Sequence, residues 1–341
     1  MKKILTFLFA VALCTATKAQ SDDAPYLTKS LSGASIQKII ARTSGGSVMV
    51  NGNAGDEPRL EVYIRSSRNA KFSKEEIQEK LAENYTLDIS VSGGQLAVTA
   101  AHKNKIFERN ELSISFKIYV PGNVSTDIHT SGGSISMANL TGDQNFSTSG
   151  GSLNINRLMG NINGRTSGGS INIVDSKSQI ALKTSGGSIR ARNCSGIISL
   201  STSGGSLSLT DLDGTIEANT SGGSVSGNNI TGELITHTSG GSMSLQSISG
   251  SLNASTHGGS MSVNVVKVGK YVTLDNSGGS VSLKIPNQPL NLDLHAQRID
   301  INPLTNFSGN KDKDNVNGTI NGGGAPVKVR SSGSMSIAFV N

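Results

Sequence analysis

A five-residue motif, Thr-Ser-Gly-Gly-Ser, recurs along the middle of this 341-residue chain at a fixed interval. Its Ser-Gly-Gly part begins with constant spacing at Ser131, Ser149, Ser167, Ser185, Ser203, Ser221 and Ser239, and His257 takes the place of Ser in the eighth copy. Looser copies begin at Ser44, Ser92, Ser277 and Ser332. A short fixed period indicates one structural unit stacked many times, so the motif restricts the chain to a solenoid-like fold.

The positions inside each repeat predict two strands. Two and four residues after the second Gly of the motif come apolar residues such as Leu207 and Leu209, and a second apolar pair, such as Ile216 and Ala218, follows. Alternation at period two is typical of a strand with one buried face. A further Gly often lies nine residues after the motif. Each repeat is therefore interpreted as two short strands joined by two glycine-marked corners, where Gly-Gly is expected to supply positive φ angles.

These coils predict an all-β fold, a single-stranded parallel β-helix or β-solenoid of about 18 residues per coil. Each strand is expected to pair with its own equivalent in the next coil, and the Ser and Thr of the motif to bond free backbone groups. Aromatic residues make up only 4% of the chain, which suits a narrow core. The Gly- and Ser-rich composition alone fits disorder as well, but disordered chains do not space Ile and Leu evenly.

The chain outside the regular repeats divides into three further parts. We expect a signal peptide at 1–19, an irregular N-terminal β part at 20–129, the regular solenoid at 130–285 and closing coils at 286–341. Ser73 with Glu76 forms a capping-box pattern that predicts one short surface helix. Residues 304–318 read as a polar loop, and the last strands, 326–340, are expected to close the end.

The first residues are typical of an exported protein. Lys2 and Lys3 precede an apolar run that is too short to span a bilayer, and the small residues before Gln20 predict cleavage after Ala19. The expected location is the extracellular space, the cell surface or the periplasm. Lipidation at Cys14 is the alternative, although Leu13 before it fits poorly. No later segment is long and apolar enough to cross a membrane.

Removal of the signal peptide changes the charge balance and the number of cysteines of the chain. It takes Lys2, Lys3 and Lys18 and no acidic residue from a chain with 30 basic and 24 acidic residues. The balance that remains does not indicate nucleic-acid binding. Removal also leaves Cys194 as the single cysteine, at a core position of its repeat, so no internal disulfide is expected.

No repeat carries the residues of a metal or cofactor site, and none is predicted. The calcium-binding nonapeptide repeat has a similar period, but its Gly and Asp are missing here. His129 and His237 occupy equivalent positions too far apart to share a metal. Asp175 and Asp211 lie two coils apart, ~9.6 Å along the stack, just beyond the usual carboxylate separation of inverting glycosidases. They are interpreted as turn residues, and a carbohydrate-active enzyme remains the alternative.

One group of residues suggests a binding site. Basic side chains at Arg165, Lys183, Arg190 and Arg192 fall on neighbouring coils and would favour contact with acidic glycans. The competing interpretation is a solvated surface without a ligand.

Several stretches resemble a known family. They are "ISFKIYVPGNVSTDIHTSGGSISM" from Ile114, "GGGAPVKVRSSGSMSI" from Gly322, and the repeated coils between them. The arrangement is similar to a bacterial "putative adhesin" family of domains of unknown function, common in Bacteroidetes. The resemblance implies a β-helical fold and an extracytoplasmic setting.

Taken with the residues, it predicts a secreted or cell-surface, non-enzymatic β-solenoid that binds partners. Candidate partners are surface glycans or cell-envelope components. The alternatives are the enzyme above and a structural envelope or matrix component.

Overall fold

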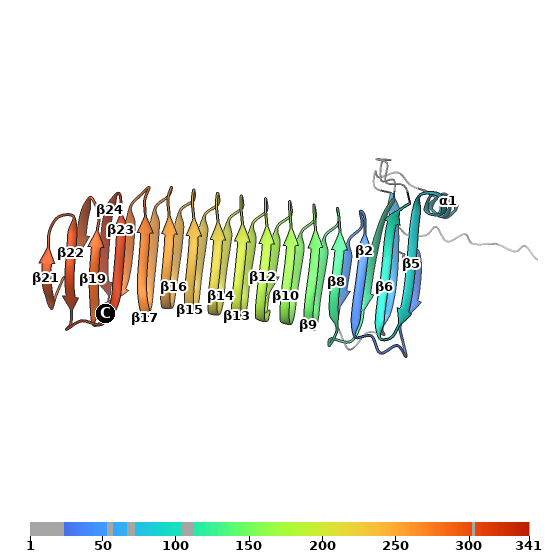
Figure 1. Cartoon of the computed structure of the whole chain (residues 1–341), viewed down its shortest axis with the longest axis horizontal. Helices are drawn as coiled ribbons and strands as arrows, with labels where there is room; N and C mark the ends of the chain where they lie inside the picture. Colours follow the sequence, from blue (N-terminus) through green and yellow to red (C-terminus); the bar gives the residue numbers. More distant parts are fainter. Residues whose placement is uncertain (1–23, 53–56, 67–71, 104–111, 302–303, 341) are drawn as a thin grey trace, which may run out of the picture.

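The structure is a computed structural model that describes residues 24–52, 57–66, 72–103, 112–301 and 304–340. The predicted signal peptide, its cleavage site after Ala19 and Cys14 lie outside these residues. Figure 1 shows a straight rod of stacked coils with α1 (Lys74–Asn84) at one end. The predicted all-β solenoid is therefore confirmed, and so is the helix, which begins at Ser73 with a complete capping box.

The middle of the rod consists of long, bent strands, one per coil. The regular strands pair in parallel, and each residue faces its equivalent in the next coil, so that Leu207 lies opposite Val225 and Thr220 opposite Thr238. In one coil the strand is split in two. The strands of this part are β9 (Ile135–Thr148), β10 (Leu153–Thr166), β11 (Ile171–Val174), β12 (Lys177–Thr184), β13 (Ile189–Thr202), β14 (Leu207–Thr220), β15 (Val225–Thr238), β16 (Met243–Thr256) and β17 (Met261–Asn276).

Each coil has two arms that build two facing sheets. The first arm, such as 207–210, belongs to what we name sheet I, and the second arm, such as 215–220, belongs to sheet II. Inward apolar residues of both arms form the core between the sheets, and Leu209 and Ile216 among them are at most 1% exposed. Because the two arms run along opposite sides of the coil, their outward side chains face opposite directions.

At the N-terminal end the strands are not stacked in chain order. Sheet I continues from β9 through β3 (Val48–Asn51), β7 (Leu112–Tyr119), β4 (Arg59–Ser66) and β1 (Leu27–Ser30). Sheet II continues through β8 (Ser125–Thr130), β2 (Lys38–Thr43), β6 (Gln95–His102) and β5 (Tyr85–Ser92). The coil of β2 and β3 is thus held between strands that follow it at a long distance in sequence. The outer strands β1, β4 and β5 pair antiparallel, which ends the repeat.

The C-terminal end shows the same interleaving. Sheet I continues through β18 (Val281–Pro286), β24 (Ser334–Val340) and β20 (Arg298–Ile301). Sheet II continues through β23 (Ala325–Ser331), β19 (Leu290–His295), β22 (Asn315–Ile320) and β21 (Phe307–Lys311). The expectation that the last strands close the end is therefore wrong, because β23 and β24 pair directly with β17 and β18 inside the stack. The expected polar loop at 304–318 is largely the hairpin of β21 and β22.

The glycine-glycine corner of the regular coils does not have the conformation expected from the sequence, because its glycines do not adopt positive φ. Instead, a Cβ on Gly205 would lie 2.0 Å from the carbonyl oxygen of Gly187 in the previous coil, whereas one on Gly204 would meet nothing nearer than 3.6 Å. Positive φ occurs at the other turn of the coil, which we name the bend, at Asp211 (54°) and Gly214 (128°). The second Gly of the motif is thus needed for close stacking of the backbone.

Threonine side chains connect successive corners. Thr202 Oγ1 donates to the carbonyl oxygen of Gly187 (2.8 Å) and accepts from the N–H of Gly205 (3.2 Å). Equivalent pairs of bonds occur at Thr148, Thr166, Thr184, Thr220 and Thr238. The expected bonding of backbone groups is confirmed for these residues. The copy at Ser92 is different, since Gly93 and Gly94 form the tight turn of the antiparallel hairpin of β5 and β6.

Candidate ligand-binding face

Sheet I presents two columns of serine hydroxyls to solvent. They stand one and three residues after the second Gly of each corner, as Ser206 and Ser208 do, and neighbouring coils place them ~4.8 Å apart. Six consecutive coils carry Ser at both positions. These pairs are Ser206/Ser208, Ser224/Ser226, Ser242/Ser244, Ser260/Ser262, Ser280/Ser282 and Ser334/Ser336.

The serine columns have a hollow at each end. At the C-terminal end, a hollow of about 630 Å³ runs across the last four of these serine pairs to Arg298 and Asp300 of β20. At the N-terminal end, a hollow of about 250 Å³ is lined by Ser47, Ser115, Ser134, Tyr63 and Lys117 among others. Both hollows open on the same face of the rod because all their strands belong to sheet I.

A network of charged and aromatic side chains borders the N-terminal hollow. Glu61 accepts from Arg59 Nε (2.8 Å) and from the hydroxyl of Tyr63 (2.9 Å). The Lys117 ammonium stands 4.3 Å from the centre of the Tyr63 ring, and the Arg59 guanidinium stands 3.8 Å from that of Tyr119. Such cation–π contacts fix the positions of long side chains. Lys117, which lines this hollow, is therefore held in place before any ligand arrives.

The ionisation of this network follows from its contacts. Burial acts to raise the pKa of Glu61, but the hydrogen bonds from Arg59 and Tyr63 and the charges of Arg59 and Lys117 outweigh it, so the pKa lies below its usual value. Burial and the hydrogen bond to Glu61 raise the pKa of Tyr63. At neutral pH Glu61 is therefore ionised and Tyr63 protonated.

The four basic residues singled out in the sequence do not form one patch. Arg190 and Arg192 lie on sheet I, whereas Arg165 and Lys183 lie side by side on sheet II. All four are exposed, and within the described chain none of their side chains forms a hydrogen bond or ion pair. The sequence interpretation grouped residues that are near along the chain but project from opposite faces of the rod.

Charge is distributed unequally between the two faces. The outward positions of the described strands of sheet I hold seven basic residues and two acidic ones. They are Arg59, Arg65, Lys117, Arg190, Arg192, Lys284 and Arg298 against Glu61 and Asp300. The corresponding positions of sheet II hold six basic and seven acidic residues. They are Lys38, Arg42, Arg165, Lys183, Lys328 and Arg330 against Asp88, Asp127, Asp143, Glu217, Glu233, Asp275 and Asp293. Sheet I is therefore the basic face of a nearly balanced protein.

Sequence reasoning missed the cluster at the N-terminal hollow. Its members come from two segments, 59–66 and 112–119, that the antiparallel register brings together, with Glu61 opposite Lys117 and Arg59 opposite Tyr119. Alternation within "RLEVYIRS" and "LSISFKIY" would have placed these residues outward. Nothing in the repeat indicated that the two segments pair.

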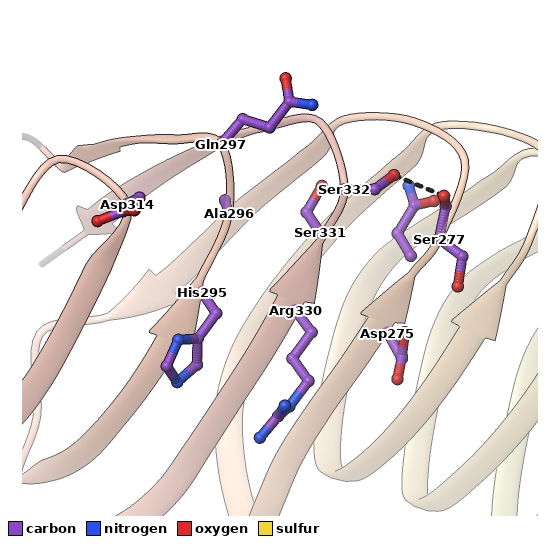
Figure 2. Close-up of a pocket in the computed structure, with 10 residues that line it drawn as sticks. Asp275, Ser277, His295, Ala296, Gln297, Asp314, Arg330, Ser331 and Ser332 are labelled. Atoms are coloured by element: carbon purple, nitrogen blue, oxygen red, sulfur yellow. Dashed lines mark hydrogen bonds between the residues drawn. The ribbon is translucent and has the colours of Figure 1, made fainter.

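Sheet II has its own hollow, of about 550 Å³, near the C-terminal end. Figure 2 shows Asp275, Arg330 and His295 in a row on the neighbouring strands β17, β23 and β19, below the corner residues Ser277 and Ser332. His295 Nε2 lies 2.8 Å from Asp293 Oδ1, and Arg330 lies 4.0 Å from the other oxygen of that carboxylate. The charges of this hollow are thus partly matched internally.

Another part of sheet II contains a hydrogen-bonded Ser-His-Asp chain. His129 Nδ1 lies 2.6 Å from Ser147 Oγ, and His129 Nε2 lies 2.7 Å from Asp127 Oδ1, while Arg42 pairs with the same carboxylate at 3.0 Å. His237 makes an equivalent contact to Ser255 (2.8 Å), but Ile235 stands where Asp127 would be. Only the first of these two histidines is therefore oriented by a carboxylate.

The remaining residues considered in the sequence as catalytic or metal-binding candidates take part in contacts that stabilise the fold. Asp175 and Asp211 sit at bends, and each carboxylate accepts from the Asn one coil further on, Asn193 and Asn229, at 2.6 Å. Cys194 is buried at 1% exposure, and burial raises the pKa of its thiol. Throughout the described ranges, no three His, Cys, Asp or Glu side chains come together as a metal site would require. None of the described helices is long and apolar enough to span a membrane.

The fold and these faces define the protein as a repetitive parallel β-solenoid with one basic, serine-lined side. Residues 198–337 match the family model described as Toastrack DUF4097, which confirms for this part of the chain the resemblance to a domain family of unknown function. No curated protein matches the chain.

Two solved structures are similar over most of the chain. A "putative cell adhesion protein" from Clostridium sporogenes ATCC 15579 is 10% identical, with a TM-score of 0.20, and the match covers 92% of this chain and 98% of that one. A "putative adhesin" from Bacteroides fragilis NCTC 9343 is 14% identical, with a TM-score of 0.35, over 76% of this chain and 96% of that one.

Proposed function

We propose that this protein is an exported binding protein that holds an acidic glycan along sheet I. The observation that carries the proposal is the union of two features on one face, the continuous serine columns and the excess of basic side chains. Hydroxyl groups can donate to and accept from the hydroxyls of a sugar, and the cations attract its carboxylates or sulfates.

The repetitive face favours many weak contacts over one strong site. Each coil adds nearly the same pair of hydroxyls, so a long ligand can make the same contact several times. We expect one soluble copy to bind weakly and clustered copies on a surface to bind much more strongly. Such behaviour suits an adhesin. Because exposed charges are screened, salt should weaken the binding.

Paired double variants on the two faces test the proposal. Arg190→Ser with Arg192→Ser removes two charges from sheet I, and Arg165→Ser with Lys183→Ser removes two from sheet II. Beads that display each protein are compared for capture of polygalacturonate and of neutral dextran at low and high salt. We expect only the sheet I variant to capture less of the acidic polymer than the unaltered protein does. Equal losses from both variants, or capture that does not respond to salt, would contradict the proposal.

The exported setting has a separate test. Mass spectrometry of the protein recovered from cells should find Gln20, free or cyclised, at the N-terminus. A lipid on Cys14 would instead anchor the protein to a membrane.

If neither soluble nor clustered protein captures any glycan, a structural role in the envelope or matrix becomes the better interpretation.

A hydrolase is the second candidate, favoured by the Ser147–His129–Asp127 chain. When Asp127 Oδ1 accepts from His129 Nε2–H, Nδ1 is left to accept the Ser147 proton, which makes Ser147 the better nucleophile. Labelling with a fluorophosphonate followed by peptide mapping tests this candidate. Modification of Ser147 but not of Ser255, whose histidine lacks the carboxylate, would support it, and modification of neither would exclude it.

A further inference from the structure

The basic residues of sheet I are gathered at three places along the rod, and Arg59, which is paired with Glu61, lies beside the first of them. We name them the first station (Arg65 and Lys117, on β4 and β7), the second station (Arg190 and Arg192, on β13) and the third station (Lys284 and Arg298, on β18 and β20). All six side chains project outward from the same sheet. They differ mainly in their distance along the axis of the rod.

The order of strands in sheet I sets the distances between the stations. Five strand-to-strand steps lead from β7 through β3, β9, β10 and β11 to β13. Five more lead through β14, β15, β16 and β17 to β18. At ~4.8 Å per step, the first and second stations are ~24 Å apart, and so are the second and Lys284 of the third. Arg298 lies two steps further, so the face spans ~58 Å from Lys117.

The stretches between the stations carry no charge at their outward positions. Between the first two stations these positions hold Ser, Asn, Met, Ala and Val, and between the second and third they hold Ser, Thr, Asn and Gln. At these outward positions a flexible anion that reaches one station meets only hydroxyls, amides and a few small apolar groups until the next, while Arg157, Asp175 and Asp211 flank the path at the adjoining bends. The charges act at separated points, because ~24 Å exceeds the Debye length of ~8 Å at physiological ionic strength.

We propose that sheet I selects acidic polysaccharides by length, through charge contacts at the three stations and hydroxyl contacts between them. This inference rests on the proposed function and adds the ligand class and its minimum size. An acidic oligomer shorter than ~24 Å can use one station only, one between ~24 and ~48 Å can use two, and only a longer one can use all three. Each further station turns a separate binding event into an intramolecular one, so affinity rises in steps.

The first station has a built place for a ligand group. Lys117 is held over the Tyr63 ring, next to Glu61, and both Lys117 and Arg65 line the hollow of about 250 Å³. The third station lies beside the larger hollow, where Arg298 stands at the end of the serine columns. The second station is exposed and lines neither of these two hollows. We therefore infer that the two ends hold the polymer and the middle station bridges them.

Oligogalacturonates of graded length, which carry a carboxylate on every sugar, are the probes for the test. Their affinities for the folded protein are measured by calorimetry beside dextran oligomers of equal length. For the unaltered protein we expect one rise of at least about tenfold as the length passes ~24 Å and another as it passes ~48 Å. In the Arg190→Ser, Arg192→Ser variant the first rise should move from ~24 to ~48 Å, because the nearest remaining pair of stations is ten steps apart.

Matched controls separate this inference from the function on which it rests. The Arg165→Ser, Lys183→Ser variant removes the same charge from sheet II and should keep both rises at their original lengths. A smooth increase of affinity with length, or a first rise that the sheet I variant leaves in place, would overturn the length selection while acidic-glycan binding stands. Failure of every acidic oligomer and of polygalacturonate to bind would overturn both.

Discussion

The corner and the bend of the regular coils both use glycine, the corner for one physical reason and the bend for two. At the corner, Gly205 is required because the backbone of the preceding coil passes where its Cβ would stand. At the bend, a Cβ on Gly214 would likewise lie 2.1 Å from the carbonyl oxygen of Gly196, and Gly214 also has a φ of 128° that other residues rarely adopt. The same residue type at two turns of one repeat therefore meets two different requirements.

The difference also appears in the hydrogen bonds that connect the coils. The corners are connected by buried threonines, such as Thr202 at 3% exposure, each bonded to two backbone groups. The bends are connected at the surface, by exposed pairs such as Asp211 with Asn229. Buried bonds contribute more to stability than exposed ones, because their loss leaves polar groups without water. We therefore expect the corner to be the less tolerant of the two turns.

The largest expected change in the free energy of unfolding comes from a substitution at one corner, where two adjacent glycines can be compared. Gly205→Ala forces a methyl group against the Gly187 carbonyl oxygen, which backbone atoms can relieve only by shifting, and should cost more than about 3 kcal/mol of unfolding free energy. Gly204→Ala meets only ordinary contacts and should cost within about 1 kcal/mol. Urea denaturation of the two variants measures both values. Similar losses would mean that close stacking is not the reason for the second glycine.

The threonine ladder gives the next effect in size. Thr202→Val keeps the shape of the side chain but leaves the Gly187 carbonyl and the Gly205 N–H without this partner. The loss of two buried contacts should cost about 2 kcal/mol. Thr202→Ser keeps the hydroxyl and should recover more than half of that loss. The comparison is made by urea denaturation under the same conditions. A valine variant as stable as the serine variant would show that packing, not hydrogen bonding, holds the corner.

The fold could be predicted from the repeat because one period specifies every coil. A constant spacing with apolar residues two and four after the motif leaves few ways to bury Leu207 and Leu209 other than stacking. The reason for Gly-Gly was not predictable in this way. Close approach between coils depends on their spacing, and a turn motif alone suggests positive φ.

The ends of the rod were the least predictable region. Val48 pairs with Ile135 and Val281 pairs with Met335, and no period connects these distant segments. The copy at Ser92 looked like a corner, although its flanking strands form an antiparallel hairpin.

The predicted basic patch does not form, and the reason is simpler. The positions of its residues within the repeat could have revealed it. Arg165 stands directly before Thr166, at the end of the second arm of its coil, whereas Arg190 directly follows Ile189, at the start of a first arm. The two residues therefore belong to different arms. The positions of charged residues within the repeat, more than their distance along the chain, decide which face they share.

A substitution in the core beneath the bend should cost less stability than the two at the corner. Cys194 stands where the next coils have Leu212 and Ile230. Cys194→Ala should cost about 1 kcal/mol because it removes one buried atom. Burial raises the pKa of the thiol, so in the folded protein it should not react with iodoacetamide at pH 8, whereas unfolding in urea should expose it. Mass spectrometry of the peptide that contains Cys194 follows both states. Rapid alkylation without urea would mean that the bend opens.

The smallest effect is expected at the surface of the bend, where two contributions oppose each other. Asp211→Gly removes the strain of a positive φ, worth about 1 kcal/mol, but it makes the unfolded chain more flexible and loses the bond to Asn229. The net change should lie within about 0.5 kcal/mol, far below that of Gly205→Ala. Asp211→Ala is the control, since it keeps the strain and loses the bond, and it should be less stable than the glycine variant by about 0.5 kcal/mol. Thermal denaturation of the two variants measures the difference. If Asp211→Gly proves as damaging as Thr202→Val, the exposed ladder at the bend holds the coils together as firmly as the buried ladder at the corner, and the contrast between the two turns is lost.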